Sequence, residues 1–290
     1  MYFLGKVGAE MSKIKVAELF YSIQGEGRYM GVPSVFLRTF GCNFTCSGFG
    51  MPKGEKSTEA VYITPENYTS YNSLPLVSTG CDSYASWDPR FKDLSPVVES
   101  DAIAERIIDM LPHKEWRDEH LVITGGEPLL GWQRSYPDLL NHDKMKNLTE
   151  LTFETNGTQE LSEDFRKYLY RNWTSTRKNN LTFSVSPKLS VSGEAWSDAI
   201  VPGIVDMYEW FGNTYLKFVV ANQADVEEAE LAVAEYRAAG FKGYVYLMPV
   251  GGVESVYCLN NRKVAELAMQ KGWRYSDRLQ VPLFKNQWGT

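Results

Sequence analysis

Short hydrophobic runs recur along most of the chain, and each has the length of one strand. The runs hold five to seven residues and are rich in β-branched and aromatic side chains, which favour extended backbone. They predict seven strands, at residues 15–20 (KVAELF), 34–40 (SVFLRTF), 120–124 (HLVIT), 151–155 (LTFET), 181–186 (LTFSVS), 215–220 (YLKFVV) and 244–250 (YVYLMPV).

Patterns with helical spacing lie between these runs. In residues 100–111, apolar side chains recur four positions apart and form one face, with Ser100 as the expected N-cap. Residues 222–240 and 260–272 each begin with Asn and end with Gly, which commonly start and stop helices. The alternation predicts an α/β fold with a parallel sheet, either barrel-like or doubly wound.

Two regions interrupt this alternation. Residues 47–80 are rich in Ser, Thr, Tyr, Pro and Gly without a sustained period, which predicts a long inserted loop. Residues 189–212 have weak periodicity, and we expect an extended connection there. Neither region reads as a linker between domains, and the chain has no internal repeat, so a single domain is expected.

Composition and charge narrow the class of protein. Hydrophobic residues make up 43% of the 290 residues, and no apolar run approaches the length of about 20 residues that crosses a bilayer. The first residues lack the apolar core of a secretory signal, so we expect a cytoplasmic protein without a membrane span. A net charge of −6 argues against nucleic acid as the main partner.

The cysteines are the first candidates for chemistry. Cys42 and Cys46 follow a predicted strand, at the end of a strand where ligand sites gather in α/β folds. Their spacing begins a Cys-x3-Cys-x2-Cys motif, but Phe49 occupies the third position. Cys81 is the nearest other thiol, and the inserted loop 47–80 could return it to the first two. Three thiolates would hold a four-iron cluster and leave one iron open.

Zinc is the main inorganic alternative. A structural zinc site takes four Cys and His ligands at close spacing, and His113, His120 and His142 form no such pattern with the cysteines. Three cysteines with a vacant fourth position fit a reactive iron–sulfur site better. Cys258 has no chemical context of this kind and is expected to be a buried or incidental thiol.

A second motif follows the predicted strand at residues 120–124. Gly125 and Gly126 let the backbone approach a ligand without a Cβ atom in the way. Glu127 offers a carboxylate to an ammonium group or to backbone donors, and Pro128 ends the motif. A tight turn after a strand is the structural alternative.

Eight stretches carry a resemblance to a known family. They are FYSIQGEGRYMGVPSVFLRTFGCNFTC, CDSYASW, TGGEPLL, FETNGT, SVSPKLS, LKFVV, YLMPVGG and NQWGT. In this order they resemble the radical S-adenosylmethionine superfamily and, within it, the 7-carboxy-7-deazaguanine synthases. The resemblance implies a partial TIM-like β/α barrel over residues 14–290, with 47–80 as an insertion in the cluster region and 1–13 as an N-terminal extension.

The resemblance also implies roles for individual residues. The [4Fe-4S] cluster ligands are Cys42, Cys46 and Cys81, and Ser83 binds Mg²⁺. The S-adenosylmethionine site comprises Gly80, Asp82, Gly126, Glu127, Ser186, Pro187 and Lys188. The substrate site comprises Ile23, Gln24, Gly25, Glu26, Arg38, Thr124 and Thr290. Arg38 is expected to pair with the substrate carboxylate, which suits its planar fork of donors.

The implied reaction is a radical-mediated ring contraction. Enzymes of this family convert 6-carboxy-5,6,7,8-tetrahydropterin to 7-carboxy-7-deazaguanine with loss of ammonia, in queuosine and 7-deazapurine biosynthesis. The resemblance implies a carbon–nitrogen lyase that takes electrons from a donor such as flavodoxin or ferredoxin and forms a homodimer.

The chain departs from the family in two places, and two other functions compete. The second and third cysteines are separated by residues 47–80, and the segment 278–290 lacks a His-Lys pair that many relatives carry. A glycyl-radical-enzyme activase would share the cluster but leaves Arg38 and the SIQGEG stretch without a role. A non-catalytic iron–sulfur or zinc-binding module would have lost the chemistry with the interrupted motif.

Overall fold

The computed structural model describes residues 12–176 and 179–290. The strands are β1 (Lys13–Ile23), β2 (Pro33–Thr39), β3 (Val97–Glu99), β4 (His120–Gly125), β5 (Glu150–Thr155), β6 (Asn180–Val185), β7 (Asn213–Val220), β8 (Val245–Pro249) and β9 (Arg274–Tyr275). The α-helices are α1 (Ser100–Met110), α2 (Tyr136–Leu140), α3 (Glu163–Leu169), α4 (Trp196–Ala199), α5 (Pro202–Glu209), α6 (Gln223–Ala239), α7 (Glu254–Lys271) and α8 (Gln280–Phe284).

All nine strands form one open sheet, in the order β3-β1-β2-β4-β5-β6-β7-β8-β9. From β2 to β9 the neighbours are parallel, whereas β1 is antiparallel to both β2 and β3. The sheet does not close on itself, because β3 and β9 are its two edges. The predicted α/β fold of the partial-barrel type is therefore confirmed, with β1 as an added antiparallel strand.

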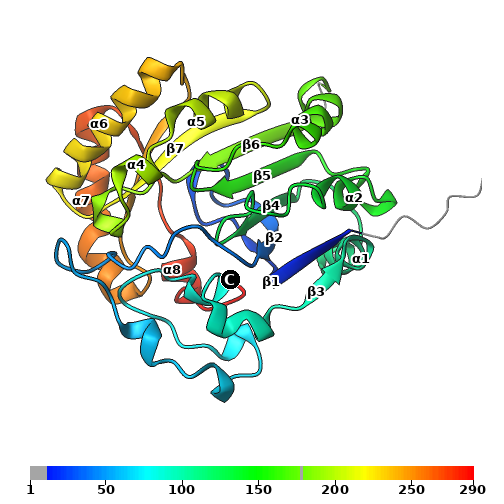
Figure 1. Ribbon diagram of the computed structural model, residues 1–290, viewed down its shortest axis with the longest axis horizontal. Coiled ribbons are helices and arrows are strands. Elements are labelled where there is room, and N and C mark those ends of the chain that lie inside the picture. Colours follow the sequence, from blue (N-terminus) through cyan, green and yellow to red (C-terminus); the bar gives the residue numbers. More distant parts are fainter. Residues whose placement is uncertain (1–11, 177–178) are drawn as a thin grey trace, which may run out of the picture.

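Helices cover the outer face of the sheet, as Figure 1 shows for α4, α5, α6 and α7. The largest core cluster lies between these layers and includes Leu121, Phe153, Phe183 and Phe218 from four successive parallel strands. Because β4 is buried along nearly its whole length, its central residues Leu121, Val122 and Ile123 are all apolar rather than alternating with polar ones.

All seven predicted strands are present, but three local predictions are wrong. The last long helix begins at Glu254 rather than at residue 260, and Asn260 instead donates from Nδ2 to the carbonyl oxygens of Val250 and Val256, both at 3.1 Å. Ser100 is the first residue of α1, and Glu99 is the N-cap; the Ser100 hydroxyl lies 2.8 Å from the Ser12 hydroxyl and caps no N–H group of the helix.

The third wrong prediction concerns the expected extended connection at residues 189–212. This stretch contains α4 and α5, whose weak periodicity reflects how few positions they bury: α5 buries only Val205 and Tyr208. A start signal was present, since Pro202 is the first residue of α5. Cys258 lies exposed on α7 and is an incidental thiol rather than a buried one.

The inserted loop, residues 47–80, has the irregular structure that its composition predicts. It contains three short 3-10 turns, Glu59–Tyr62, Pro65–Asn67 and Tyr71–Ser73. The predicted N-terminal extension, residues 1–13, lies outside the described residues except for its last two positions. No helix within the described ranges is long and apolar enough to cross a membrane.

Candidate functional site

A cavity of about 260 Å³ lies at the carboxyl ends of the parallel strands. Among the residues predicted from the sequence, those that line it are Cys42, Cys46, Cys81, Ile23, Gln24, Gly25, Glu26, Arg38, Gly80, Asp82, Ser83, Thr124, Gly126, Ser186, Lys188 and Thr290. Glu127 and Pro187 do not line it. A second hollow of about 600 Å³ lies where β7 and β8 begin and involves none of these residues.

The inserted loop leaves and returns at adjacent points. The N–H of Gly80 donates to the carbonyl oxygen of Phe49 at 2.7 Å, and Ser57 N–H donates to the Ser47 carbonyl oxygen, also at 2.7 Å. Cys81 therefore follows directly beside Phe49, the position where an uninterrupted motif would carry its third cysteine. The insertion lengthens the sequence between the second and third cysteines without removing the third thiol from the site.

The three thiols share one apolar surrounding. Cys42, Cys46 and Cys81 pack in one cluster with Phe44 and Phe49. Burial raises the pKa of the Cys42 thiol to about 12 and, together with the nearby Asp82, that of Cys81 to about 11. Burial also raises the pKa of Cys46. All three thiols would stay protonated at neutral pH unless a bound cation stabilised the thiolates.

This donor set fits an iron–sulfur cluster better than a single ion. Within residues 12–176 and 179–290, no three Cys, His, Asp or Glu side chains converge on one metal-ion position. The thiolates of a four-iron cluster each bind a different iron, so they need to face a common space rather than meet at a point. Three thiols that line one cavity meet that requirement.

The loop that carries Cys42 and Cys46 has a strained backbone, which a side chain from another segment stabilises. Cys46 has φ of 48°, a left-handed conformation that few non-glycine residues adopt. A single carboxylate oxygen of Glu194 accepts the N–H groups of Thr45 at 2.9 Å and Cys46 at 2.7 Å. Glu194 therefore stabilises the turn that carries the second thiol, a role that the sequence did not suggest.

The Gly-Gly-Glu-Pro turn packs directly on the cysteine loop. A Cβ atom on Gly126 would lie 2.6 Å from the Cβ of Cys42 and 2.5 Å from the carbonyl oxygen of Gly41. Only glycine fits this contact, which brings the turn against the first thiol. The turn thus forms one side of the thiol end of the cavity.

Glu127 stays a predicted S-adenosylmethionine residue, but it does not line the cavity. Its side chain is fully buried and accepts the N–H of Asn156 at 2.7 Å, the N–H of Leu129 at 3.0 Å and the hydroxyl of Thr155 at 2.8 Å. Burial raises its pKa to about 7. Glu127 therefore satisfies backbone donors and shapes the turn, which was the structural alternative.

The Ser-Pro-Lys turn follows β6 on the same edge of the sheet. Lys188 Nζ donates to the carbonyl oxygen of Ser186 at 2.9 Å and to its hydroxyl at 3.2 Å. No carboxylate in the described part of the chain forms a salt bridge with Lys188, so its positive charge is available to an anionic group in the cavity.

Arg38 and Ser83 lie together at another part of the cavity. Arg38 Nε donates to Glu18 at 2.8 Å, and its Nη1 donates to the Ser83 hydroxyl at 3.1 Å. Burial raises the pKa of Glu18. Arg38 and the N–H of Gly289 lower this pKa, but by less than burial raises it. Glu18, which the sequence analysis did not identify, fixes the orientation of the guanidinium.

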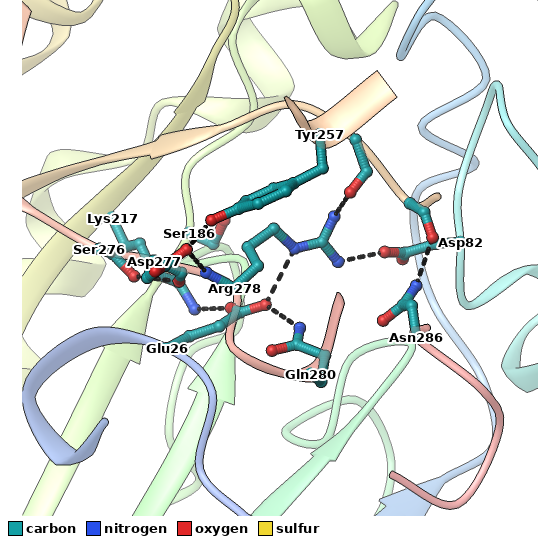
Figure 2. A network of polar contacts seen from close by, with 12 residues as sticks. Glu26, Asp82, Ser186, Lys217, Tyr257, Ser276, Asp277, Arg278, Gln280 and Asn286 are labelled. Carbon is teal, nitrogen blue, oxygen red and sulfur yellow. Dashed lines mark hydrogen bonds and ion pairs between the residues drawn. The ribbon is translucent and has the colours of Figure 1, made fainter. Parts of the chain in front are cut away.

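A buried charge network adds residues that the sequence analysis missed. Figure 2 shows the Arg278 side chain between Glu26 and Asp82, with Lys217 and Gln280 also directed at the Glu26 carboxylate. Burial alone would raise the pKa of Glu26, but the charges of Lys217 and Arg278 lower it to about 2. The network keeps two carboxylates ionised inside the cavity.

Glu154 is a further cavity residue that was missed. Its carboxylate accepts Gln24 Nε2 at 3.1 Å and the Thr124 hydroxyl at 3.3 Å. Two of the missed residues had a signal in the sequence: Lys217 is a charge inside an apolar strand, and Glu154 is a charge at a strand end. Arg278 had none, because it lies in an irregular segment far along the chain.

Comparisons with known proteins agree with this geometry. No protein-family model matches the chain. The chain is 32% identical over 292 residues to the 7-carboxy-7-deazaguanine synthase of Halobacterium salinarum, covering 96% of this chain and 93% of that protein. It is 27% identical over 285 residues to the 7-carboxy-7-deazaguanine synthase of Pyrobaculum aerophilum, covering 96% and 97%. The crystal structure of QueE from Escherichia coli matches its fold with a TM-score of 0.53 and 20% identity, covering 92% of this chain and 94% of that one.

Proposed function

Because the chain belongs to the family of 7-carboxy-7-deazaguanine synthases, we propose that its cavity binds 6-carboxy-5,6,7,8-tetrahydropterin beside the three cysteines. The family is one of radical S-adenosylmethionine lyases, and the reaction forms 7-carboxy-7-deazaguanine with loss of ammonia. The observation that carries the proposal is that Cys42, Cys46 and Cys81 line the same cavity as Arg38. A glycyl-radical-enzyme activase gives no account of that arrangement.

A [4Fe-4S] cluster with S-adenosylmethionine supplies the radical chemistry of this family, and the protein supplies binding and orientation. Cys42, Cys46 and Cys81 are the cluster ligands in this proposal. Lys188 is suited to the carboxylate of the methionyl group, because its ammonium lines the cavity without a salt-bridge partner in the described ranges. Gly126 exposes backbone to the same space.

Arg38 is suited to the carboxylate of the pterin. Glu18 holds Nε and Ser83 holds Nη1, so the guanidinium is fixed and keeps further donors for a ligand. Gln24 and Glu154 line the same cavity and offer acceptors for the N–H groups of the pterin ring. The inserted loop and residues 286–290 contribute walls of this cavity.

Ser83 is the proposed Mg²⁺ ligand. Its hydroxyl lies 3.1 Å from Arg38 Nη1, so a carboxylate bound by Arg38 would be close to a hard oxygen ligand, which Mg²⁺ prefers. We expect the Mg²⁺ dependence of the rate to disappear in Ser83→Ala while the iron content is unchanged. An unaltered Mg²⁺ titration in this variant would contradict the assignment.

The test is anaerobic reconstitution followed by turnover. The protein should take up about four irons per chain and form 7-carboxy-7-deazaguanine from the tetrahydropterin, S-adenosylmethionine and a reductant. Arg38→Lys keeps the charge but loses the planar fork, so KM for the pterin should rise while iron content stays constant. Arg262→Lys, the same change on an exposed side chain of α7, is the control.

Absence of product with an intact cluster would refute the proposed reaction. An unchanged KM in Arg38→Lys would refute the role of Arg38 alone. A flavodoxin or ferredoxin as electron donor and a homodimer remain predictions from the resemblance. Turnover with each redox protein in place of a chemical reductant tests the first, and the molar mass in solution tests the second.

A further inference from the structure

The segment after α8, residues 286–290, turns back over the cavity. Lys285 and Asn286 have φ of 58° and 55°, two consecutive left-handed conformations at non-glycine residues. Asn286 Nδ2 donates to the carbonyl oxygen of Gly252 at 2.7 Å. The N–H groups of Lys285 and Asn286 donate to the carbonyl oxygens of Val281 and Gln280, both at 2.9 Å, so the turn ends α8 and redirects the chain.

Trp288 supplies the main contact of this segment. Its ring packs edge-on against Tyr71, with centroids 5.5 Å apart, and against Tyr84, with centroids 5.6 Å apart. These geometries are favourable for aromatic pairs. Tyr71 belongs to the inserted loop and Tyr84 follows the third cysteine, so the two regions form one socket for Trp288. Figure 1 shows the red end of the chain beside the cyan segment that contains them.

The socket is rigid on the side of the insertion. The Tyr71 hydroxyl bonds to the carbonyl oxygen of Ala85 at 2.6 Å and to the Ser95 hydroxyl at 2.7 Å. Tyr84 packs edge-on against Phe91, 5.2 Å between centroids. The socket residues are therefore held in place by the body of the protein, independently of Trp288.

Gly289 lies against the inserted loop. It has φ of 83°, and a Cβ atom there would lie 3.3 Å from Oδ1 of Asn72 in the insertion. Four of the five residues of the segment line the cavity that Arg38 also lines. The segment is thus a wall of the cavity, with the inserted loop packed against it.

We propose that the inserted loop increases the affinity of the protein for its substrate. Tyr71 of this loop, together with the neighbouring Tyr84, holds Trp288. This contact positions residues 286–290 as the cavity wall beside Arg38. Trp288 is a positioning residue in this account. The inference rests on the proposed function, since it assigns the pterin to the part of the cavity that contains Arg38.

The test compares Trp288→Ala, Trp288→Phe and Tyr71→Ala in the reconstituted protein. Trp288→Ala should raise KM for the pterin about tenfold, equal to about 1.4 kcal/mol of lost binding, with kcat and iron content nearly unchanged. Trp288→Phe should restore most of the affinity, because it keeps the ring. Trp210→Ala, which removes a tryptophan that is 75% exposed, is the matched control.

Two further measurements separate positioning from general damage. Hydrogen exchange of residues 286–290 should accelerate in Trp288→Ala and in Tyr71→Ala, but not in the control. The double variant Trp288→Ala/Tyr71→Ala should have a KM for the pterin no higher than that of the more severe single variant, since both changes break the same contact.

The proposal would be overturned if Trp288→Ala and the wild type had the same KM for the pterin and the same hydrogen exchange of residues 286–290. A loss of iron that accompanies the rise in KM would also overturn it, because the socket would then support the cysteine loop. If Trp288→Phe loses as much affinity as Trp288→Ala, the ring contact is not the cause. If the wild type carries its iron–sulfur cluster but forms no product, the proposed function is contradicted. Hydrogen exchange then still decides whether the socket holds residues 286–290.

Discussion

Replacing Arg278 by Met removes the charge at the centre of the buried network and keeps an unbranched side chain of similar length. Arg278 pairs with Glu26 at 3.3 Å and with Asp82, and it also donates to the carbonyl oxygen of Gly251. In Arg278→Met, Glu26 keeps Lys217 and Gln280 as partners, whereas Asp82 loses its cation.

The expected loss of stability follows from the pKa of Glu26. That pKa is lowered from 4.5 to about 2, which corresponds to roughly 3 kcal/mol of preferential stabilisation of the ionised form. Lys217 and Arg278 both contribute to it. Removing one partner of a buried pair costs about 3–5 kcal/mol, so we expect Arg278→Met to lower the free energy of unfolding by about 3 kcal/mol.

The pH dependence has a definite sign. Because the folded pKa of Glu26 lies below the unfolded value, its stabilisation is fully present above about pH 4.5 and is lost as the pH falls towards 2. In Arg278→Met the folded pKa of Glu26 moves back towards 4.5. The acid-dependent part of the stability should therefore be smaller in the variant.

Urea denaturation under anaerobic conditions, followed by circular dichroism at pH 7 and pH 4, measures both effects. Asp82→Asn in the Arg278→Met background should recover part of the loss, because it removes the unpaired carboxylate. Arg262→Met, at a side chain that is 90% exposed, should change stability by less than about 0.5 kcal/mol. A loss below about 1 kcal/mol in Arg278→Met, with unchanged pH dependence, would refute the reasoning.

Three further predictions follow from the site and the core. Cys81→Ser should lose the four-iron cluster, whereas Cys258→Ser, on the exposed face of α7, should keep the iron content of the wild type; the reverse result would mean that the third ligand is misassigned. Glu194→Gln leaves one acceptor for the N–H groups of the strained cysteine loop but removes its charge, so it should keep iron better than Glu194→Ala; equal losses in chelator challenge would contradict this role. His120 is buried, and its pKa is lowered from 6.5 to about 3. Its contribution to the free energy of unfolding is therefore present above pH 6.5 and is lost by about 1.4 kcal/mol per pH unit as the pH falls towards 3. His120→Gln should flatten this slope between pH 6.5 and 5 in urea denaturation, and an unchanged slope would exclude His120 as its source.

The hydrophobic pattern alone predicted the long helix α6 and seven of the nine strands that the described residues form, whereas the short edge strands β3 and β9 gave no signal. Continuous apolar runs specify buried parallel strands, because strands covered on both faces lack polar alternation. The N-cap of α6 was also predicted from the sequence. The structure confirms it, since the Asn222 side chain accepts the N–H groups of Ala224 and Asp225. Motifs at strand ends identified the three cysteines and the Gly-Gly turn that line the cavity, because parallel strands deliver their carboxyl ends to one edge of the sheet.

The packing of distant segments sets which further residues complete the cavity. The return of Cys81 to Phe49 depends on a hydrogen bond across the inserted loop, and Arg278 reaches Glu26 across 252 positions of sequence. The same holds for the contact between Tyr71 and Trp288. Local patterns record the periodicity of burial within one element, whereas these contacts depend on how irregular segments pack together. For that reason the sequence could propose Cys81 as the third thiol, whereas its position beside Phe49 depends on how the inserted loop packs.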